Sequence, residues 1–283
     1  MATFIPLDWE LIEISGPDAQ KYLQGQLTCD INALAAGAST LTAHCDPKGK
    51  MTSIFRLLKV SEQQFFMLIN KGLFTALDAL KKYAVFSKVT FTPLDWQIVG
   101  AIDCHCGKVN PQYRLELDEQ RAILLNPTAL EVSLSDCTEQ WAAADILAGL
   151  PHLTAATQNE FIPQALNLQA IEQAVSFSKG CYIGQETVAR AKYRGINKRA
   201  MFILQGTSSS LPQSGSALEM QLENGWRQTG CIINATQYEG KLYLLAVLNQ
   251  EIEVQPALRL PEDHSPLQIL PLPYTLASIQ IPP

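Results

Sequence analysis

A hairpin turn near the N-terminus restricts the fold more than any other feature of this sequence. In Asp46-Pro47-Lys48-Gly49, proline presets φ for the turn and glycine accepts a positive φ. Apolar and β-branched residues before and after the turn predict two strands that it joins. The first hundred residues predict strands over 9–14, 41–45, 51–60, 64–69, 88–92 and 97–102, and helices over 19–27 and 73–84. Strands joined by hairpins, with helices inserted, indicate an α+β sandwich of the ferredoxin-like kind.

The rest of the chain changes in character after Arg199. Before that residue we predict short strands over 113–117 and 122–125 and helical segments over 141–147 and 166–171. After it, β-rich runs over 200–204, 229–235 and 241–248 are separated by polar loops rich in glycine and proline. This pattern predicts a small antiparallel barrel or sandwich. With 283 residues the chain exceeds one ordinary core, and residues 103–111 are a plausible junction between domains.

Composition indicates the compartment. No apolar run reaches the roughly 18 residues that a membrane span needs, and the N-terminus lacks the basic segment of a signal peptide. The seven cysteines show no pairing rhythm, which fits free thiols in a reducing compartment. We therefore expect a soluble cytoplasmic protein.

Charge is unevenly distributed along the chain. The net charge is −6, which argues against a constitutive nucleic-acid binder. The segment from Lys179 to Arg199 nevertheless carries six basic residues and one acid, so the remaining chain carries −11. This basic segment is either a solvated helix face or a site for an anion such as a carboxylate tail or a phosphate.

The same segment contains Cys181, which lies between Gly180 and Gly184. A helical run from Gln185 to Tyr193 follows, and Gly195 can terminate it. A thiol just before a helix N-terminus, with Lys179 nearby, is favoured as thiolate, the form that attacks electrophiles or carries sulfur. The alternative is that the glycines mark a tight turn and that the cysteine only fits the space.

Other candidate sites are weaker. Cys104-His105-Cys106 lacks the second ligand pair of a structural zinc site, so we interpret it as a loop and predict no metal site. Trp9 and Trp141 are either core residues or aromatic surfaces for a flat heterocycle. The motifs of P-loop, dinucleotide-binding and G-x-S-x-G enzymes are missing from the sequence.

The run K-G-C-Y-x-G-Q-E-x-x-x-R at residues 179–190 resembles the signature of the YgfZ family. The resemblance spans almost the whole chain in order and is weakest over residues 103–135. It includes YLQGQLT (22–28), AHCDPKGKM (43–51), KKYAVFSKVT (81–90), FIPQALNLQA (161–170), AKYRGINKRA (191–200) and PLPYTL (271–276).

Proteins of this family are similar in fold to the T-protein of the glycine cleavage system, a tetrahydrofolate-dependent aminomethyltransferase. The resemblance implies an α+β fold with two ferredoxin-like α+β domains and a C-terminal antiparallel β-barrel around a central folate channel. The corresponding divisions are residues 1–103, 104–198, which carries the K-G-C-Y signature, and 199–283.

The resemblance also implies a ligand and a set of site residues. The ligand is folate, as tetrahydrofolate or a derivative, with Trp9 and Trp141 at its site and Cys181 as the functionally required cysteine. A polyglutamylated folate is an anion, so we predict that Arg190 and Arg194 hold its tail. The family role that follows is maintenance of iron–sulfur enzymes, which supports tRNA modification by thiomethylation.

Three hypotheses follow. The first is a folate-binding accessory protein whose partners are iron–sulfur client enzymes such as a tRNA methylthiotransferase. The second is a folate-dependent one-carbon transferase of the aminomethyl or methyl type. The third is a tRNA-binding module that uses the basic segment, which the net charge disfavours. We expect a monomer without stable nucleic-acid binding or membrane attachment.

Overall fold

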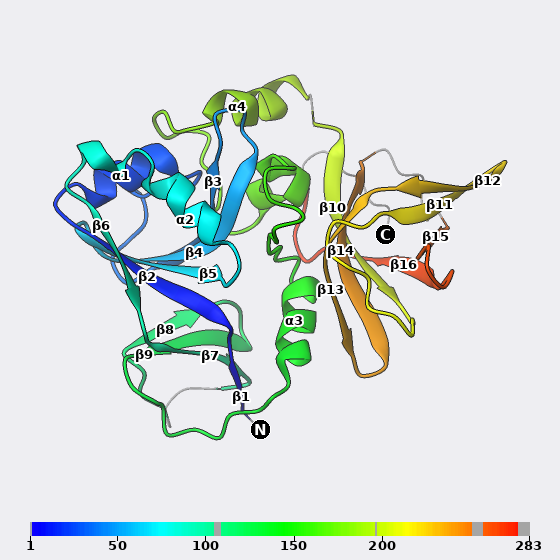
Figure 1. Ribbon diagram of the computed structural model, residues 1–283, viewed down its shortest axis with the longest axis horizontal. Helices are drawn as coiled ribbons and strands as arrows, with labels where there is room; N and C mark the ends of the chain where they lie inside the picture. Colours follow the sequence, from blue (N-terminus) through cyan, green and yellow to red (C-terminus); the bar gives the residue numbers. More distant parts are fainter. Residues whose placement is uncertain (1, 105–108, 196, 251–256, 277–283) are drawn as a thin grey trace.

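In the part of the chain that the structure describes, the strands form sheets of five, four and seven strands. The structure, a computed structural model, describes residues 2–104, 109–195, 197–250 and 257–276. In Figure 1 the five-stranded and four-stranded sheets lie on one side of the molecule and the seven-stranded sheet lies on the other. Within the described ranges, no helix has the length and apolar character that a membrane crossing requires.

The five-stranded sheet is built on the predicted hairpin turn. Phe65 and Met67 pack in the core that also contains residues of helices α1 (Ala19–Gln26) and α2 (Phe74–Lys81). Phe66 and Leu68, on the other face, pack toward the four-stranded sheet. The strand that carries them is apolar throughout because both of its faces are covered. The strand order is β3 (Ser39–Cys45), β4 (Met51–Ser61), β5 (Gln64–Asn70), β2 (Trp9–Ser15) and β6 (Thr90–Leu94).

The four-stranded sheet joins the N-terminus to the middle of the chain. Ile98, Ile123 and Leu125 of this sheet pack against the five-stranded sheet, together with Trp141. Its other face carries a smaller cluster that includes Val99 and Leu124. The order is β1 (Thr3–Pro6), β7 (Gln97–Ile102), β9 (Arg121–Asn126) and β8 (Tyr113–Glu116).

The seven-stranded sheet forms the C-terminal part. Met201 and Ile203 of β10 face the core shared with the five-stranded sheet, whereas Phe202 and Leu204 face a core of the C-terminal part itself. The order is β12 (Gly225–Thr229), β11 (Leu218–Leu222), β15 (Leu258–Arg259), β16 (Pro266–Leu270), β10 (Arg199–Gly206), β14 (Lys241–Asn249) and β13 (Cys231–Tyr238).

The segment between the sheets is held by a buried asparagine. The Asn167 side chain donates to the Met201 carbonyl at 2.7 Å and accepts from the Met201 N–H at 3.1 Å. Helix α3 packs against β13 and lies between the sheets (Figure 1). The helical elements here are α3 (Thr138–Leu147), η2 (Pro163–Leu166), η3 (Leu168–Ala170) and α4 (Gln185–Arg194), and η1 (Ala84–Phe86) follows α2.

The predicted α+β class with a β-rich C-terminal part is confirmed. The helix predicted over residues 166–171 is instead two short 3₁₀ turns, because Asn167 between them adopts a left-handed conformation with φ of 59°. Five short strands were not predicted: β1, β11, β12, β15 and β16.

Candidate functional site

A cleft of about 400 Å³ opens between the five-stranded sheet, helix α3 and strand β13. Trp9 and Asn70, which are register partners in β2 and β5, line it on the side of the sheet. Trp141 lines it from α3, and Asn234 lines it from β13. Its size is typical of small-molecule sites, and elements distant in sequence meet there. We call it the central cleft.

His152 lies in the central cleft just after α3. Its ring contacts that of Trp9, with ring centroids 5.7 Å apart and planes inclined at 52°. Its Nε2 lies 2.8 Å from a carboxylate oxygen of Asp145, so this nitrogen carries the proton. When the imidazole is neutral, this tautomer leaves Nδ1 as an acceptor, and among the described residues that atom has no hydrogen-bond partner.

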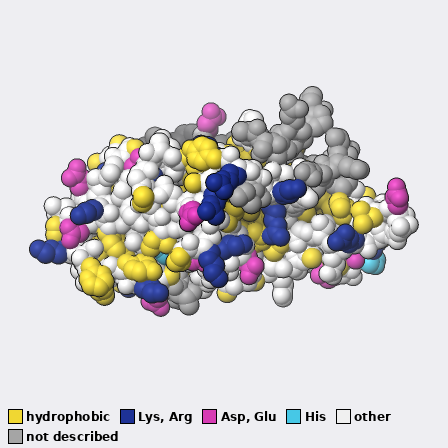
Figure 2. All heavy atoms as spheres, turned by 90° about the horizontal axis from the view of Figure 1, so that it is seen from above, with side chains coloured by type: hydrophobic (Ala, Val, Ile, Leu, Met, Phe, Trp, Pro, Cys, Tyr) yellow, Lys and Arg dark blue, Asp and Glu magenta, His cyan; other side chains and the backbone are white. Residues whose placement is uncertain are grey.

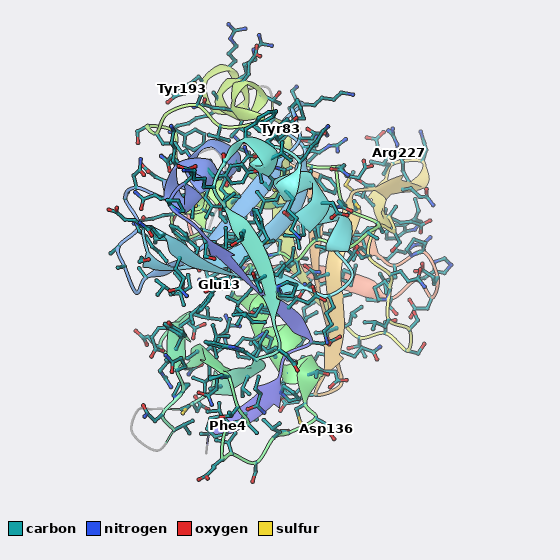
Figure 3. All side chains as sticks on the ribbon, turned by 60° about the vertical axis from the view of Figure 1, so that its left-hand side comes forward. Phe4, Glu13, Tyr83, Asp136, Tyr193 and Arg227 are labelled. Atoms are coloured by element: carbon teal, nitrogen blue, oxygen red, sulfur yellow. The ribbon has the colours of Figure 1, made fainter. Side chains whose placement is uncertain are left out.

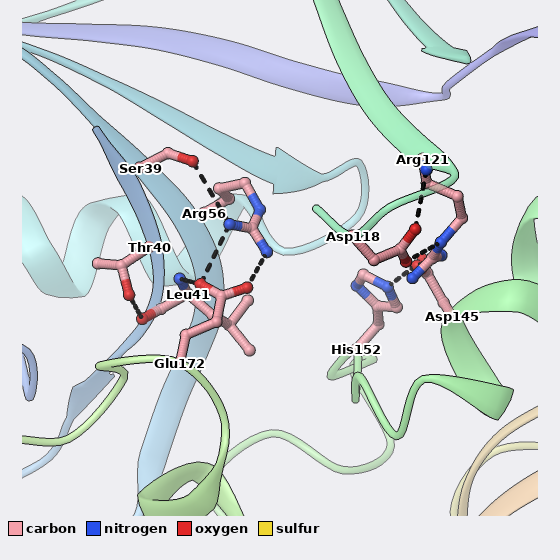
Figure 4. A network of polar contacts seen from close by, with 9 residues as sticks. All are labelled: Ser39, Thr40, Leu41, Arg56, Asp118, Arg121, Asp145, His152 and Glu172. Atoms are coloured by element: carbon pink, nitrogen blue, oxygen red, sulfur yellow. Dashed lines mark hydrogen bonds and ion pairs between the residues drawn. The ribbon is translucent and has the colours of Figure 1, made fainter. Parts of the chain in front are cut away.

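Asp145 is a buried carboxylate that orients His152. Its other oxygen pairs with the Arg121 guanidinium at 2.6 Å, and Arg121 also pairs with Asp118 at 2.7 Å (Figure 4). Burial alone would raise the pKa of Asp145, but the hydrogen bond and charge of His152 and the charge of Arg121 outweigh it and lower the pKa. The carboxylate therefore stays ionised and fixes the imidazole.

Arg56 lines a small pocket that shares Trp9 and His152 with the central cleft. Its guanidinium forms a two-pronged pair with the Glu172 carboxylate, with N–O distances of 2.6 and 3.2 Å (Figure 4). Glu172 also accepts the backbone N–H of Leu41 at 2.7 Å. This pair places a fixed, paired cation in the small pocket beside the central cleft.

Trp141 is mainly a buried wall. Its side chain is 4% exposed, and its ring packs so closely on Gly100 that an added Cβ there would lie 2.5 Å from a ring atom. The Arg121 guanidinium lies 5.4 Å from the ring centroid. Among the described residues, the indole N–H has no hydrogen-bond partner, although a buried tryptophan usually finds one. The cleft wall thus contains an unused donor.

Arg190 lines a different cleft, of about 500 Å³. Lys50, Lys198 and Arg199 line it as well, and we call it the basic cleft. Figure 2, which views the molecule from the α4 side, shows lysine and arginine side chains gathered on this face. Lys50, just before β4, and Arg56 within it are six positions apart, a span of about 20 Å, so the two clefts are well separated. Arg194 is exposed and lines neither cleft.

The loop before α4 is anchored by Lys179. Its ammonium group donates to the backbone carbonyls of Leu27 and Cys29, each at 2.7 Å. Burial lowers the pKa of Lys179 to about 8, partly offset by the nearby Cys29 and Asp30. The lysine charge is therefore directed into the protein, whereas the sequence interpretation placed it beside Cys181.

Cys181 is exposed between two anchored neighbours. Lys179 lies two residues before it, and buried Tyr182 follows, with the lysine ammonium 5.0 Å from its ring centroid. The Ile183 N–H then donates to Gly25 at the end of α1 at 3.2 Å. The thiol lines neither cleft and faces solvent from a fixed loop.

Helix α4 begins against the predicted hairpin turn. Gly184 has φ of 81°, and an added Cβ would lie 2.6 Å from the Asp46 carbonyl oxygen. The predicted end at Gly195, with φ of 60°, is confirmed. Within the helix, Glu186 pairs with Arg190 at 2.5 Å. No atom lies within 4 Å of a Cβ added at Gly180. Close approach of the backbone is therefore a property of Gly184 alone in this loop.

The predicted site residues occupy three places. Trp9 and Trp141 share the central cleft, Arg190 lies in the basic cleft, and Cys181 and Arg194 are exposed outside both. His105 and Cys106 of the cysteine-containing loop lie outside the described residues.

The polar residues of the central cleft were missed as site residues. Arg56 and Asp145 each interrupt an apolar run, in β4 and in α3, and this sequence signal could have identified them. Their partners Glu172 and His152 have no comparable signal.

Comparison with known proteins gives three further findings. The family model described as "YgfZ, beta-barrel domain" matches residues 197–263. An uncharacterized protein of Haemophilus influenzae is 58% identical over 278 residues, which cover 98% of this chain and 99% of that protein. The tRNA-modifying protein YgfZ of Pectobacterium carotovorum is 42% identical over 308 aligned positions, which cover 97% and 92%.

The fold has a relative among solved structures. The glycine cleavage system aminomethyltransferase T of Bartonella henselae superposes with a TM-score of 0.68, covering 96% of this chain and 86% of that one. Sequence identity is 14%, so this likeness shows the fold alone.

Proposed function

The chain belongs to the YgfZ family, and on this premise we propose that it is a folate-binding accessory protein that supports iron–sulfur enzyme assembly or repair. Through that role it serves tRNA modification by thiomethylation. Folate, as tetrahydrofolate or a derivative, binds in the central cleft, and Cys181 is the functional thiol.

The unused polar groups of the central cleft are the observation that carries the proposal. A pterin ring is flat and has an edge of alternating donors and acceptors. Trp9 offers an aromatic surface, and the Trp141 N–H is an unpaired donor. The Asn70 amide, which has no hydrogen-bond partner among the described residues, offers both a donor and an acceptor. These groups fit a bound heterocycle, which would supply the one-carbon chemistry of reduced folates.

Tryptophan fluorescence tests this binding. Tetrahydrofolate should give a saturable change with the wild type, and Trp9→Ala should weaken binding at least about tenfold because the aromatic contact is lost. Trp226→Ala, which removes a partly exposed tryptophan on the C-terminal sheet, is the matched control and should bind normally. No saturable change with the wild type would refute folate binding.

Arg190 and Arg194 are proposed to act on the folate tail. Since the basic cleft lies about 20 Å along β4 from the central cleft, only an extended polyglutamyl chain would reach it. Arg190→Ala and Arg194→Ala should therefore weaken binding of a polyglutamylated folate and leave monoglutamate binding unchanged. If the substitutions change the affinities for polyglutamylated and monoglutamylated folate equally, these arginines do not bind the tail.

Cys181 is proposed to act on the client enzyme, because the loop displays its thiol away from both clefts. We expect Cys181→Ala to fold normally and to fail to restore tRNA thiomethylation in a deletion strain. Cys137→Ala, which removes another exposed cysteine, should restore it fully. Full restoration by Cys181→Ala would mean that this thiol has no functional role.

A folate-dependent one-carbon transferase is the second candidate, and the His152–Asp145 pair favours it. An oriented imidazole with a free acceptor nitrogen can take a proton from an amine in the cleft. Incubation with methylene- or formyl-tetrahydrofolate and candidate acceptors should then give turnover that His152→Ala abolishes. If turnover stays at background with many acceptors, the transferase candidate is refuted and the accessory role remains.

A further inference from the structure

Three apolar side chains near the end of α2 are exposed to solvent. The exposed fractions are 93% for Phe86, 78% for Val85 and 40% for Tyr83. Burying side chains of this size is strongly favourable, so a solvent-facing group of them marks a contact surface. With the exposed Lys82 and Lys88, these residues form what we call the 82–88 surface.

The 82–88 surface is held in place by the fold. The Ser87 N–H donates to Ala84 at 2.9 Å and closes the turn η1. The backbone of Lys88 is fixed on both sides by Asp18, which accepts from its N–H at 2.8 Å and donates to its carbonyl at 3.3 Å. The apolar tip is therefore presented in one conformation, which lowers the entropy cost of binding a partner.

The charged side chains of the 82–88 segment itself are of one sign. Residues 79–94 include Lys81, Lys82 and Lys88 and no acidic residue, although the whole chain has net charge −6. A partner with complementary charge presents an apolar pocket rimmed by carboxylates.

One short helix connects this surface to the loop of Cys181. At the start of α1, Asp18 binds the backbone of Lys88, and at its end Gly25 accepts from Ile183. The eight residues of α1 span about 12 Å, so the surface and the thiol loop flank the same helix. In Figure 3, Tyr83 and Tyr193 of α4 both lie toward the upper end of the molecule.

We propose that the 82–88 surface is the docking site for a client protein, which inserts Phe86 and Val85 into an apolar pocket rimmed by Asp and Glu. Docking there places the client beside Cys181, so this inference rests on the proposed function.

The surface favours a protein partner over a membrane or a second copy. Phe86 and Val85 together bury less apolar area than one acyl chain, and a single acyl chain gives only marginal membrane attachment. A two-fold dimer through this surface would bring the lysines of both copies together.

The test uses purified tRNA methylthiotransferase with its clusters intact. Wild-type protein should bind it, with affinity that falls as salt rises. Phe86→Ala and Lys82→Glu should each weaken binding at least about tenfold. Leu211→Ala is the matched control, since Leu211 is 55% exposed in the C-terminal part, and it should bind like the wild type. All variants should keep tetrahydrofolate affinity.

Several results would overturn this assignment. The first is that the wild type does not bind the methylthiotransferase, and the second is that Phe86→Ala binds it as well as Leu211→Ala does. The third is that Phe86→Ala weakens binding to phosphatidylglycerol vesicles, or self-association, more than it weakens binding to the methylthiotransferase.

Restoration of thiomethylation separates the two levels of the proposal. If Phe86→Ala restores it and Cys181→Ala does not, docking is wrong and the proposed function stands. If Cys181→Ala restores it, the thiol role fails, whereas binding through Phe86 is decided by the affinity measurement.

Discussion

His44 shows how burial sets the behaviour of a single residue. Its side chain lies inside the β3–β4 hairpin, where Nδ1 lies 2.7 Å from the Thr52 hydroxyl, and Nε2 has no partner among the described residues. Desolvation lowers the pKa of His44 to about 4, although the charge of Asp46 acts in the opposite direction. The folded protein therefore holds this imidazole neutral.

Acid should destabilise the protein through His44. In the unfolded chain the pKa of His44 is near 6.5, so between about pH 6.5 and 4 the unfolded state binds more protons than the folded state. The free energy of unfolding therefore decreases as the pH is lowered through this range. The shift corresponds to about 3 kcal/mol at full effect. His44→Gln should lose this component, so urea midpoints of the two proteins should converge as pH falls. A constant difference between the urea midpoints of the wild type and His44→Gln from pH 7 to 4.5 would contradict this prediction.

At the scale of elements, local signals were sufficient for the β3–β4 hairpin and for α4. The turn Asp46–Gly49 and the terminal Gly195 have conformational needs that few residues meet. Strands β11 and β12 were missed because most of their side chains are partly or fully exposed, so no regular alternation marks them. The Arg56–Glu172 pair joins residues 116 positions apart, which no local pattern can indicate.

The contact between α4 and the hairpin turn should require a glycine at position 184. Gly184→Ala places a Cβ 2.6 Å from the Asp46 oxygen in a left-handed backbone, so both clash and strain destabilise it. Gly195→Ala has a similar φ with open space around it, and it measures strain alone. The urea midpoint should fall clearly further for Gly184→Ala than for Gly195→Ala. If the urea midpoint decreases equally in both variants, the turn moves to accommodate the added methyl group.

On the scale of the whole molecule, two asparagines hold loops of the middle segment against the C-terminal sheet. Asn167 binds the backbone of Met201, and Asn234 binds both backbone groups of His152. The central cleft depends on the second link because it fixes the loop of His152 against β13. Division into folding units at residues 103 and 198 stays a prediction.

Loss of the Asn167 link should weaken the whole fold. Asn167→Ala leaves two buried backbone groups of Met201 unpaired, at a cost of about 2–4 kcal/mol. Asn159→Ala is the matched control, since Asn159 has φ of 62° but is exposed. Unfolding monitored by tryptophan fluorescence should show a much larger effect at Asn167, and similar midpoints would mean that water replaces the side chain.

The anchoring of Lys179 has a consequence for biosynthesis. Its ammonium binds carbonyls near residue 27, on a part of the chain made 152 positions earlier. During synthesis, these two hydrogen bonds cannot form until the segment with Lys179 has left the ribosome, so the loop that displays Cys181 is not anchored before then. A nascent chain that ends before Lys179 lacks this anchor, so the loop that exposes Cys181 takes its place only after that lysine has been added.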